Sequence, residues 1–290
     1  ASPEYRALGQ NTRINQARYL EMIAAEHGHR SVAGVRPAHV YVMRDRMAET
    51  PGKANAWVSM FRSLMSYACR LDQRGDNPAA GIKMLALGEH EPWPSDLLRV
   101  ALDEATPMTR LAIVTGLCSG QRVSDCIRMQ YGWIDGGIME LAQQKTGKLV
   151  AIPIHPFWTE ELRRLPRSAT TLLYERSGAP FRTTGAIQAR LRDLMVMPAV
   201  REVHADLVAR ELITADATFS FHGLRKNACC YLLELGLSDT ETGSILGMSS
   251  EMVRHYGKRA RALMIARGAA ERVTGGKILP LPGATGSRRI

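Results

Sequence analysis

The chain has 290 residues, of which 45% are apolar, 23% charged and 6% aromatic, a composition typical of a globular protein of about two domains. Its longest clean apolar run, residues 111–119, is too short to span a bilayer, and its N-terminus lacks the basic and apolar regions of a signal peptide. The net charge of +10 suits a protein that binds a polyanion, although an arginine-rich genome produces the same balance.

The first part of the chain is predicted to be helical. Apolar residues recur at helical spacing in three segments, residues 12–25, 37–48 and 53–71. The polar stretch 88–94 then contains three helix breakers and is typical of a domain boundary. We therefore expect a helical domain over residues 1–90, a second domain over residues 91–274 and a flexible tail over residues 275–290.

The second domain begins with helices and then changes its periodicity. Helices are predicted first at residues 95–104, 107–117 and 121–129, with Thr106 as an N-cap. Residues 138–142 and 149–154 then read as two strands joined by the polar turn 145–148, which predicts a β-hairpin with a basic tip. Helices return at residues 184–197, 199–213, 222–235, 239–246 and 249–268. The fold class is therefore mainly α with a small β-hairpin or sheet.

The sequence lacks the motifs of several common kinds of cofactor and metal chemistry. There is no Gly-rich phosphate loop, no GxGxxG, no HExxH and no carboxylate cluster for two Mg²⁺ ions, so we expect no cofactor and no metal. The five cysteines are odd in number and form no CxxC pair, which argues against a disulfide framework or a zinc site. A chain of this kind that acts on a phosphodiester must supply charge, proton transfer and nucleophile from its side chains.

Four segments carry side chains that suit this chemistry. They are 115–125 with Arg122, the hairpin tip with Lys145, 221–226 with His222 and Arg225, and 254–259 with Tyr256. In segment 115–125, Asp125 lies one turn beyond Arg122 and could orient it. Taken singly, each has a more ordinary interpretation, as a solvated charge, a structural histidine or a half-buried ring. Their conjunction in a basic chain favours a common site.

In this order the segments resemble the motifs of the tyrosine recombinases, also called phage-type integrases. The sequence at 115–125 resembles the first-arginine motif, and residues 143–148 resemble the β-hairpin lysine motif. His222-Gly-Leu-Arg225 matches the His-x-x-Arg motif, and residues 246–250 followed by Tyr256 resemble the Leu-Gly-His-Ser-Ser…Tyr segment. The resemblance covers residues 95–270 by motif.

The resemblance implies a role for each matched residue. Tyr256 would attack a phosphodiester and leave a 3′-phosphotyrosine and a free 5′-hydroxyl. Arg122 and Arg225 would neutralise the charge that builds on the phosphate oxygens. Lys145 would protonate the departing 5′ oxygen, and His222 would assist proton transfer or hold the phosphate.

One position departs from the family pattern. Met248 lies where the family commonly has His or Trp, and a thioether cannot donate a hydrogen bond to phosphate. His255 is a candidate to supply the missing donor. Two alternatives follow: a catalytically impaired DNA-binding protein of the same fold, and an enzyme similar to a type IB topoisomerase.

The resemblance also implies the partners. We expect an all-helical core-binding domain and a mixed α+β catalytic domain that together clamp double-stranded DNA. Four copies would assemble on two DNA sites, with accessory DNA-bending proteins as further candidates and no membrane association. A bacterial mobile element or prophage, acting in the cytoplasm at the nucleoid, is the expected setting. Integration, excision and resolution all fit this interpretation, and the tail either docks on a neighbouring subunit or stays disordered.

Overall fold

The computed structural model describes residues 2–88 and 90–258 of the chain. The chain divides into two compact units, unit 1 (residues 1–89) and unit 2 (from His90 onward). The predicted tail, 275–290, and the end of the predicted helix 249–268 lie outside the described residues. None of the described helices combines the length and apolar character needed to cross a bilayer.

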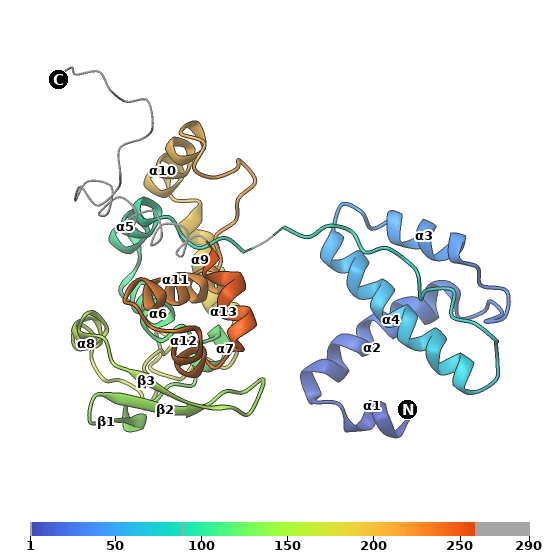
Figure 1. The fold of residues 1–290 in the computed structure, drawn as a ribbon, viewed down its shortest axis with the longest axis horizontal. Helices are drawn as coiled ribbons and strands as arrows, with labels where there is room; N and C mark the ends of the chain where they lie inside the picture. Colours follow the sequence, from blue (N-terminus) through green and yellow to red (C-terminus); the bar gives the residue numbers. More distant parts are fainter. Residues whose placement is uncertain (1, 89, 259–290) are drawn as a thin grey trace, which may run out of the picture. The chain divides into compact units, whose positions relative to one another are not determined.

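All of the regular secondary structure in the described part of unit 1 is helical (Figure 1). Its helices are α1 (Pro3–Ala7), α2 (Gln10–His27), α3 (Pro37–Asp45) and α4 (Pro51–Arg70). The three predicted helices are confirmed as α2, α3 and α4, whereas α1 was not predicted because five residues are too few to show a period. Helix α4 supplies the centre of the core, where Trp57 stacks on Phe61 with ring centres 4.9 Å apart.

Part of the positive charge of unit 1 is used to hold its own backbone. Arg62 donates hydrogen bonds to the carbonyl oxygens of Ala79 and Ile82, at 2.8 and 3.0 Å. Arg74 donates to the carbonyl oxygen of Val32 at 2.8 Å. These bonds fix the segment that follows α4. Some of the arginines of unit 1 are therefore not available to bind a polyanion.

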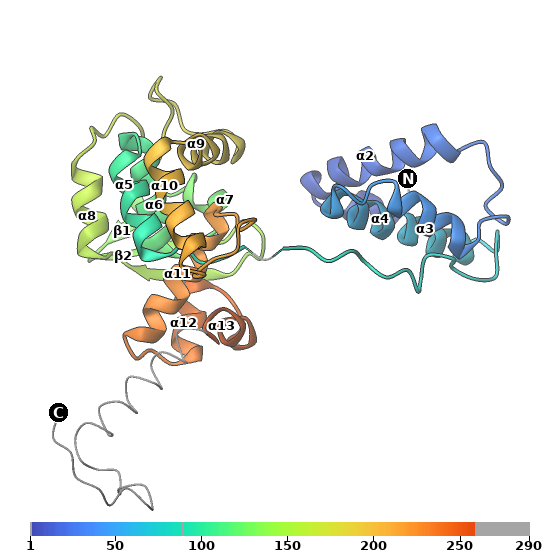
Figure 2. The ribbon, with the colours of Figure 1, turned by 90° about the horizontal axis from the view of Figure 1, so that it is seen from above.

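Unit 2 is built around two central helices that lie side by side in both views (Figures 1 and 2). They are α6 (Pro107–Ser119) and α11 (Phe221–Glu234). Residues 111–116 of α6 are all buried, so the longest apolar run of the chain is a core helix. The other helices are α5 (Ser95–Glu104), α7 (Val123–Cys126), α8 (Pro156–Arg163), α9 (Gly185–Met195), α10 (Pro198–Ala209), α12 (Asp239–Leu246) and α13 (Ser250–Tyr256), with a 3₁₀ turn at Tyr131–Trp133.

A small antiparallel sheet completes unit 2. Its strands, in the order β1-β2-β3, are β1 (Ile134–Asp135), β2 (Ile138–Ala142) and β3 (Leu149–Pro153). The predicted hairpin is confirmed as β2 and β3, with Leu141 opposite Val150 and alternate residues buried against the core. Strand β1 was not predicted, because two residues cannot show alternation. The fold is thus mainly α with one small sheet, as predicted.

The helix ends test the capping predictions. Ser238 and Glu241 have the sequence spacing of a capping box, and they form this reciprocal pair of bonds at the start of α12. Thr106 precedes α6 as predicted, but its hydroxyl bonds that of Thr109 at 2.9 Å and makes no capping bond to the backbone. The helix predicted at 121–129 is only four residues long, and Arg122, its N-cap, has an extended backbone. This shortening leaves Arg122 at the edge of the helix, with its side chain directed by tertiary contacts.

Candidate active site

Two of the predicted site residues lie on the first turn of α11. His222 and Arg225 are three residues apart, and Gly223 lies between them. A Cβ on Gly223 would collide with the carbonyl oxygen of Glu91 and with the ring of Trp93. A glycine is therefore needed in the His-x-x-Arg segment because the chain at 91–93 packs directly on the start of this helix.

Arg225 is buried beneath the site, with a side chain that is 3% exposed. Its guanidinium donates a 2.7 Å hydrogen bond to the carbonyl oxygen of Gly120. Gly120 ends α6 at a φ of 60°, and a Cβ there would meet Leu246 and Ala228. This left-handed glycine turns the chain so that Arg122 follows two residues later, close to Arg225.

A buried network of amide side chains connects three segments around Arg122. Gln143, at the end of β2, is 1% exposed and donates to Gln121 Oε1 at 2.6 Å and to the carbonyl oxygen of Leu246 at 2.9 Å. Its Oε1 accepts from Arg122 at 3.2 Å and from the Thr146 hydroxyl at 2.8 Å. Gln143 therefore joins the Arg122 segment, the β2–β3 turn and the end of α12.

Replacing Gln143 by alanine is expected to lower the free energy of unfolding by about 2–4 kcal/mol, because several buried partners lose their hydrogen bonds together. The matched control is Gln144→Ala: the Gln144 side chain is exposed, and only its backbone N–H bonds Asp125. That control should change the free energy by less than about 0.5 kcal/mol. Urea unfolding measures both, and equal losses from the two variants would contradict this role for Gln143.

Tyr256, the last residue of α13, completes the cluster. Its hydroxyl shares a 2.8 Å hydrogen bond with Nε2 of His222. The ammonium of Lys226, one helical turn beyond His222, lies 5.4 Å from the centre of the Tyr256 ring. The aromatic body of Tyr256 packs beside Leu246 and Val253, so its hydroxyl is the part presented to the basic groups.

The electrostatics of the cluster favour an anion. Burial, and then His90, Arg225, Lys226 and Arg122, lower the pKa of His222 to about 4, so this imidazole is neutral at pH 7. Burial and Arg122 lower the pKa of Arg225 to about 10, while Tyr256 and Asp125 raise it, so Arg225 is still charged at pH 7. Arg122, Arg225 and Lys226 lie close together although their positive charges repel one another. Such a group of cations provides a site for a phosphate.

The low pKa of His222 predicts a pH dependence of stability. Between pH 6.5, its ordinary pKa, and about pH 4, the unfolded chain binds a proton at this residue and the folded chain does not. The free energy of unfolding should therefore fall as the pH is lowered through this window. Urea unfolding of wild type and His222→Gln at several pH values isolates the effect, since other titrating groups are common to both. A wild-type advantage that stays constant from pH 7 to pH 4 would contradict this prediction.

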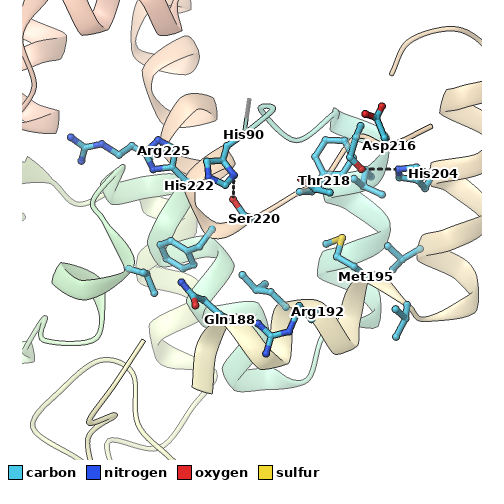
Figure 3. Close-up of a pocket in the computed structure, with 18 of the residues that line it drawn as sticks. His90, Gln188, Arg192, Met195, His204, Asp216, Thr218, Ser220, His222 and Arg225 are labelled. Atoms are coloured by element: carbon cyan, nitrogen blue, oxygen red, sulfur yellow. Dashed lines mark hydrogen bonds between the residues drawn. The ribbon is translucent and has the colours of Figure 1, made fainter. Parts of the chain in front are cut away.

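Beside the cluster lies a cavity of about 1350 Å³. One end is lined by His222, Arg225 and His90, and the rest by α9, α10 and the segment that leads into α11 (Figure 3). Arg122 also lines the cavity and interacts electrostatically with His222 and Arg225. Arg192 and Arg201 add two further cations to its lining. The cavity is wide enough for part of a large ligand, and its basic end is where the anionic group of that ligand would lie.

The predicted residues are placed as follows. Arg122, His222, Arg225 and Tyr256 come together, although 134 positions separate the first from the last. Lys145 is exposed in the β2–β3 turn and does not line the cavity. Neither of the two weaker candidates lines the cavity. Met248 packs with the apolar residues around α12, and His255 is exposed, with its ring centre 5.9 Å from that of Tyr256.

Other residues of the site were not predicted to have a role. Lys226 and Gln143 stand inside the quoted motifs, and the helical spacing of Lys226 from His222 was the available signal. Asp125 was expected to orient Arg122, but its Oδ1 instead accepts from the backbone N–H of Gln144 at 2.7 Å. No cluster of three His, Cys, Asp or Glu side chains among the described residues could hold a metal ion.

Solved structures of integrases have a similar fold. A lambda integrase fragment, as a dimer bound to a COC′ core site, is 20% identical over 87% of this chain and 90% of that chain, with a TM-score of 0.72. A lambda integrase tetramer bound to a Holliday junction is 20% identical over 87% of this chain and 72% of that chain, with a TM-score of 0.71. A Tn1549 transposon integrase fragment with circular intermediate DNA is 16% identical over 88% and 94% of the two chains, with a TM-score of 0.65.

The sequence matches no protein-family model and no curated protein. The resemblance carried by the sequence motifs is confirmed at the level of the fold, because the similarity to the solved integrases extends over both units. The chain thus has the fold of the tyrosine recombinases, among them the lambda and Tn1549 integrases.

Proposed function

We propose that this protein is a site-specific DNA recombinase that cleaves and rejoins DNA through a 3′-phosphotyrosine at Tyr256. One observation carries the proposal. The hydroxyl of Tyr256 is 2.8 Å from Nε2 of His222, at the basic end of a cavity that Arg122 and Arg225 also line. A nucleophile, a neutral imidazole and two guanidinium groups in one place supply the attack, the proton acceptor and the charge stabilisation of metal-independent phosphodiester transfer.

In the proposed cleavage step, the roles of Tyr256 and His222 follow from these positions, and the role of Lys145 follows from the family resemblance. The Tyr256 oxygen forms a bond to phosphorus while the bond from phosphorus to the 5′ oxygen breaks. The proton of the phenol passes to the neutral His222, and Lys145 gives a proton to the departing 5′ oxygen. Rejoining reverses the step, with a DNA 5′-hydroxyl as the nucleophile. The phosphodiester energy is kept in the tyrosyl ester, so no nucleotide fuel is consumed.

The two arginines stabilise the transition state in this scheme. Negative charge grows on the non-bridging oxygens as the fifth bond to phosphorus forms, and planar guanidinium groups can donate to two such oxygens. Arg225 is held against the carbonyl oxygen of Gly120, so its position is fixed before the DNA arrives. Arg122 is held in the same way by Gln143. This preorganisation avoids a reorganisation cost during the reaction.

The partner in this proposal is double-stranded DNA. The net charge of +10 supports it, as do the similar solved structures, in which lambda integrase is bound to a core site and to a Holliday junction. We infer that unit 1 is the core-binding domain and unit 2 the catalytic domain, and that four copies act on two sites. A bacterial mobile element or prophage, acting at the nucleoid, is the setting proposed, with accessory DNA-bending proteins as further partners.

The test is covalent capture. DNA that binds the Tyr256→Phe protein is first selected from a random duplex pool, and the selected site is then built into a nicked suicide duplex. The full-length wild-type protein should form an adduct that resists SDS, attached to the 3′ phosphate, and should release a fragment with a free 5′-hydroxyl. Radiolabelling each strand end in turn identifies the attached side. A 5′-phosphotyrosine would contradict the proposed polarity.

The same experiment separates the two alternatives. Tight binding of the selected duplex without any adduct would identify a silent DNA-binding protein of this fold and overturn the proposal. Adducts that form equally on unselected duplexes, together with relaxation of any supercoiled plasmid, would identify an enzyme that resembles type IB topoisomerases. Adducts confined to the selected site support a recombinase.

A further inference from the structure

The site as described has fewer free phosphate donors than its arginines suggest. One arm of Arg225 is occupied by the carbonyl oxygen of Gly120, and one arm of Arg122 by Gln143. The side chain of Met248 has no N–H or O–H group, and it packs in the apolar cluster around α12. A donor from elsewhere in the chain would therefore add directly to the binding of a phosphate.

His90, the first residue of unit 2, has the position for such a donor. Its ring centre lies 5.3 Å from that of His222, and it lines the same end of the cavity as His222 and Arg225 (Figure 3). The imidazole is exposed, so it can reach a bound ligand. Among the described histidines, only His90, His204 and His222 line this cavity, and His204 lies on α10 at its other end.

The chain around His90 is held firmly. The backbone N–H of Trp93 donates to Asn227 Oδ1 at 2.7 Å, and the Asn227 amide donates back to the carbonyl oxygen of Trp93 at 2.8 Å. The Trp93 indole donates to the carbonyl oxygen of Ser220 at 2.9 Å. These bonds fix the segment against the start of α11, three residues from His90.

The hydrogen bond between His90 and Ser220 indicates that the His90 ring is positioned for a ligand. Ser220 is the N-cap residue of α11, but its hydroxyl makes no capping bond to the helix and instead lies 3.0 Å from Nδ1 of His90. When this hydroxyl donates to Nδ1, the proton of a neutral imidazole is on Nε2, which becomes a hydrogen-bond donor. Ser220 thus orients the ring and leaves its other nitrogen for a ligand.

We propose that His90 is a further phosphate-binding residue, whose Nε2 donates a hydrogen bond to a non-bridging oxygen of the scissile phosphate. This inference rests on the proposed function, and it assigns to His90 the contribution that Met248 cannot make. No bond is made or broken by His90: it stabilises the charge that builds on that oxygen, together with Arg122 and Arg225.

The test compares His90→Ala, His90→Gln and His204→Ala in the full-length protein, on the selected suicide duplex. Adduct formation is measured in single turnover at saturating DNA. We expect His90→Ala to be about 10- to 100-fold slower than wild type, somewhat less than the loss of a fully buried oxyanion donor. His90→Gln keeps an N–H and should recover part of the rate, and His204→Ala should stay within about threefold. DNA affinity, measured in the Tyr256→Phe background, should change less than threefold because many phosphates share the binding.

A modified substrate separates phosphate binding from a structural role. In a suicide duplex with a methylphosphonate at the scissile position, one charged oxygen is replaced by a methyl group. If His90 acts on that oxygen, His90→Ala should slow this duplex much less than the natural one. Equal slowing on both duplexes, or less than threefold slowing on the natural one, would overturn the inference. A wild-type protein that forms no adduct would overturn the proposed function itself, and the inference with it.

Discussion

Tyr256→Phe is expected to abolish the covalent adduct completely, the largest effect of any single substitution in this protein. The variant lacks only the oxygen that would bond to phosphorus, and its ring can keep the contact with the ammonium of Lys226. The hydrogen bond to His222 is also lost, which should lower the free energy of unfolding by about 1 kcal/mol. Adduct formation on the suicide duplex measures the loss of cleavage, and fluorescence anisotropy measures whether DNA affinity is retained.

Tyr231 provides a matched control for Tyr256. It too has a hydroxyl in contact with a histidine, since His155 Nε2 lies 3.2 Å from its oxygen, but Tyr231 is exposed and His155, unlike His222, does not line the cavity. Tyr231→Phe should therefore form the adduct at the wild-type rate, while Tyr256→Phe binds the duplex with unchanged affinity and forms none. Adduct retained by Tyr256→Phe, or lost only in Tyr231→Phe, would show that the nucleophile has been misassigned.

Arg225→Lys should cause the second largest loss, at least about 100-fold in the single-turnover cleavage rate. Lysine keeps the positive charge but has no planar fork, so its ammonium cannot bond the carbonyl oxygen of Gly120 and also present paired N–H groups to a phosphate. The side chain is 3% exposed, so Arg225→Ala would leave the Gly120 carbonyl oxygen buried without this donor and would confuse catalysis with folding.

Arg128→Lys is the control for that variant. Arg128 is an exposed arginine just beyond α7, and replacing it by lysine should leave the cleavage rate within about threefold of wild type. Thermal unfolding of both variants checks that the fold is intact. A cleavage rate for Arg225→Lys that also stays within threefold would mean that charge alone suffices at this position, and that the fork geometry is not used.

The sequence predicted the larger elements of the fold because their periodicity is strong. The helices α5, α6, α9 and α11 each extend over ten or more residues, and each was placed within two residues at its start. The hairpin was found because two short and mainly apolar runs, residues 138–142 and 149–154, flank a polar turn. The short elements α1, α7 and β1 were missed or misjudged, because two to five residues do not establish a period.

The site was predictable only as far as local motifs reach. Arg122, His222, Arg225 and Tyr256 each stand in a short recognisable segment. The order of these segments along the chain predicted that the four residues share one site. His90 stands in no motif, and its place beside His222 depends on 132 positions of intervening chain folding back. The same is true of the bonds of Gln143 to Gln121 and Leu246, which only the tertiary packing reveals.

The amide network around Gln143 also limits how this sequence can vary. Gln121 and Gln143 bond each other, and Gln121 donates in turn to the carbonyl oxygens of Ser119 and Ile245. A change at either glutamine alone leaves a polar atom stranded in the interior, while a suitable change at both at once need not. We therefore expect Gln121 and Gln143 to co-vary: homologues should either keep both glutamines or replace both.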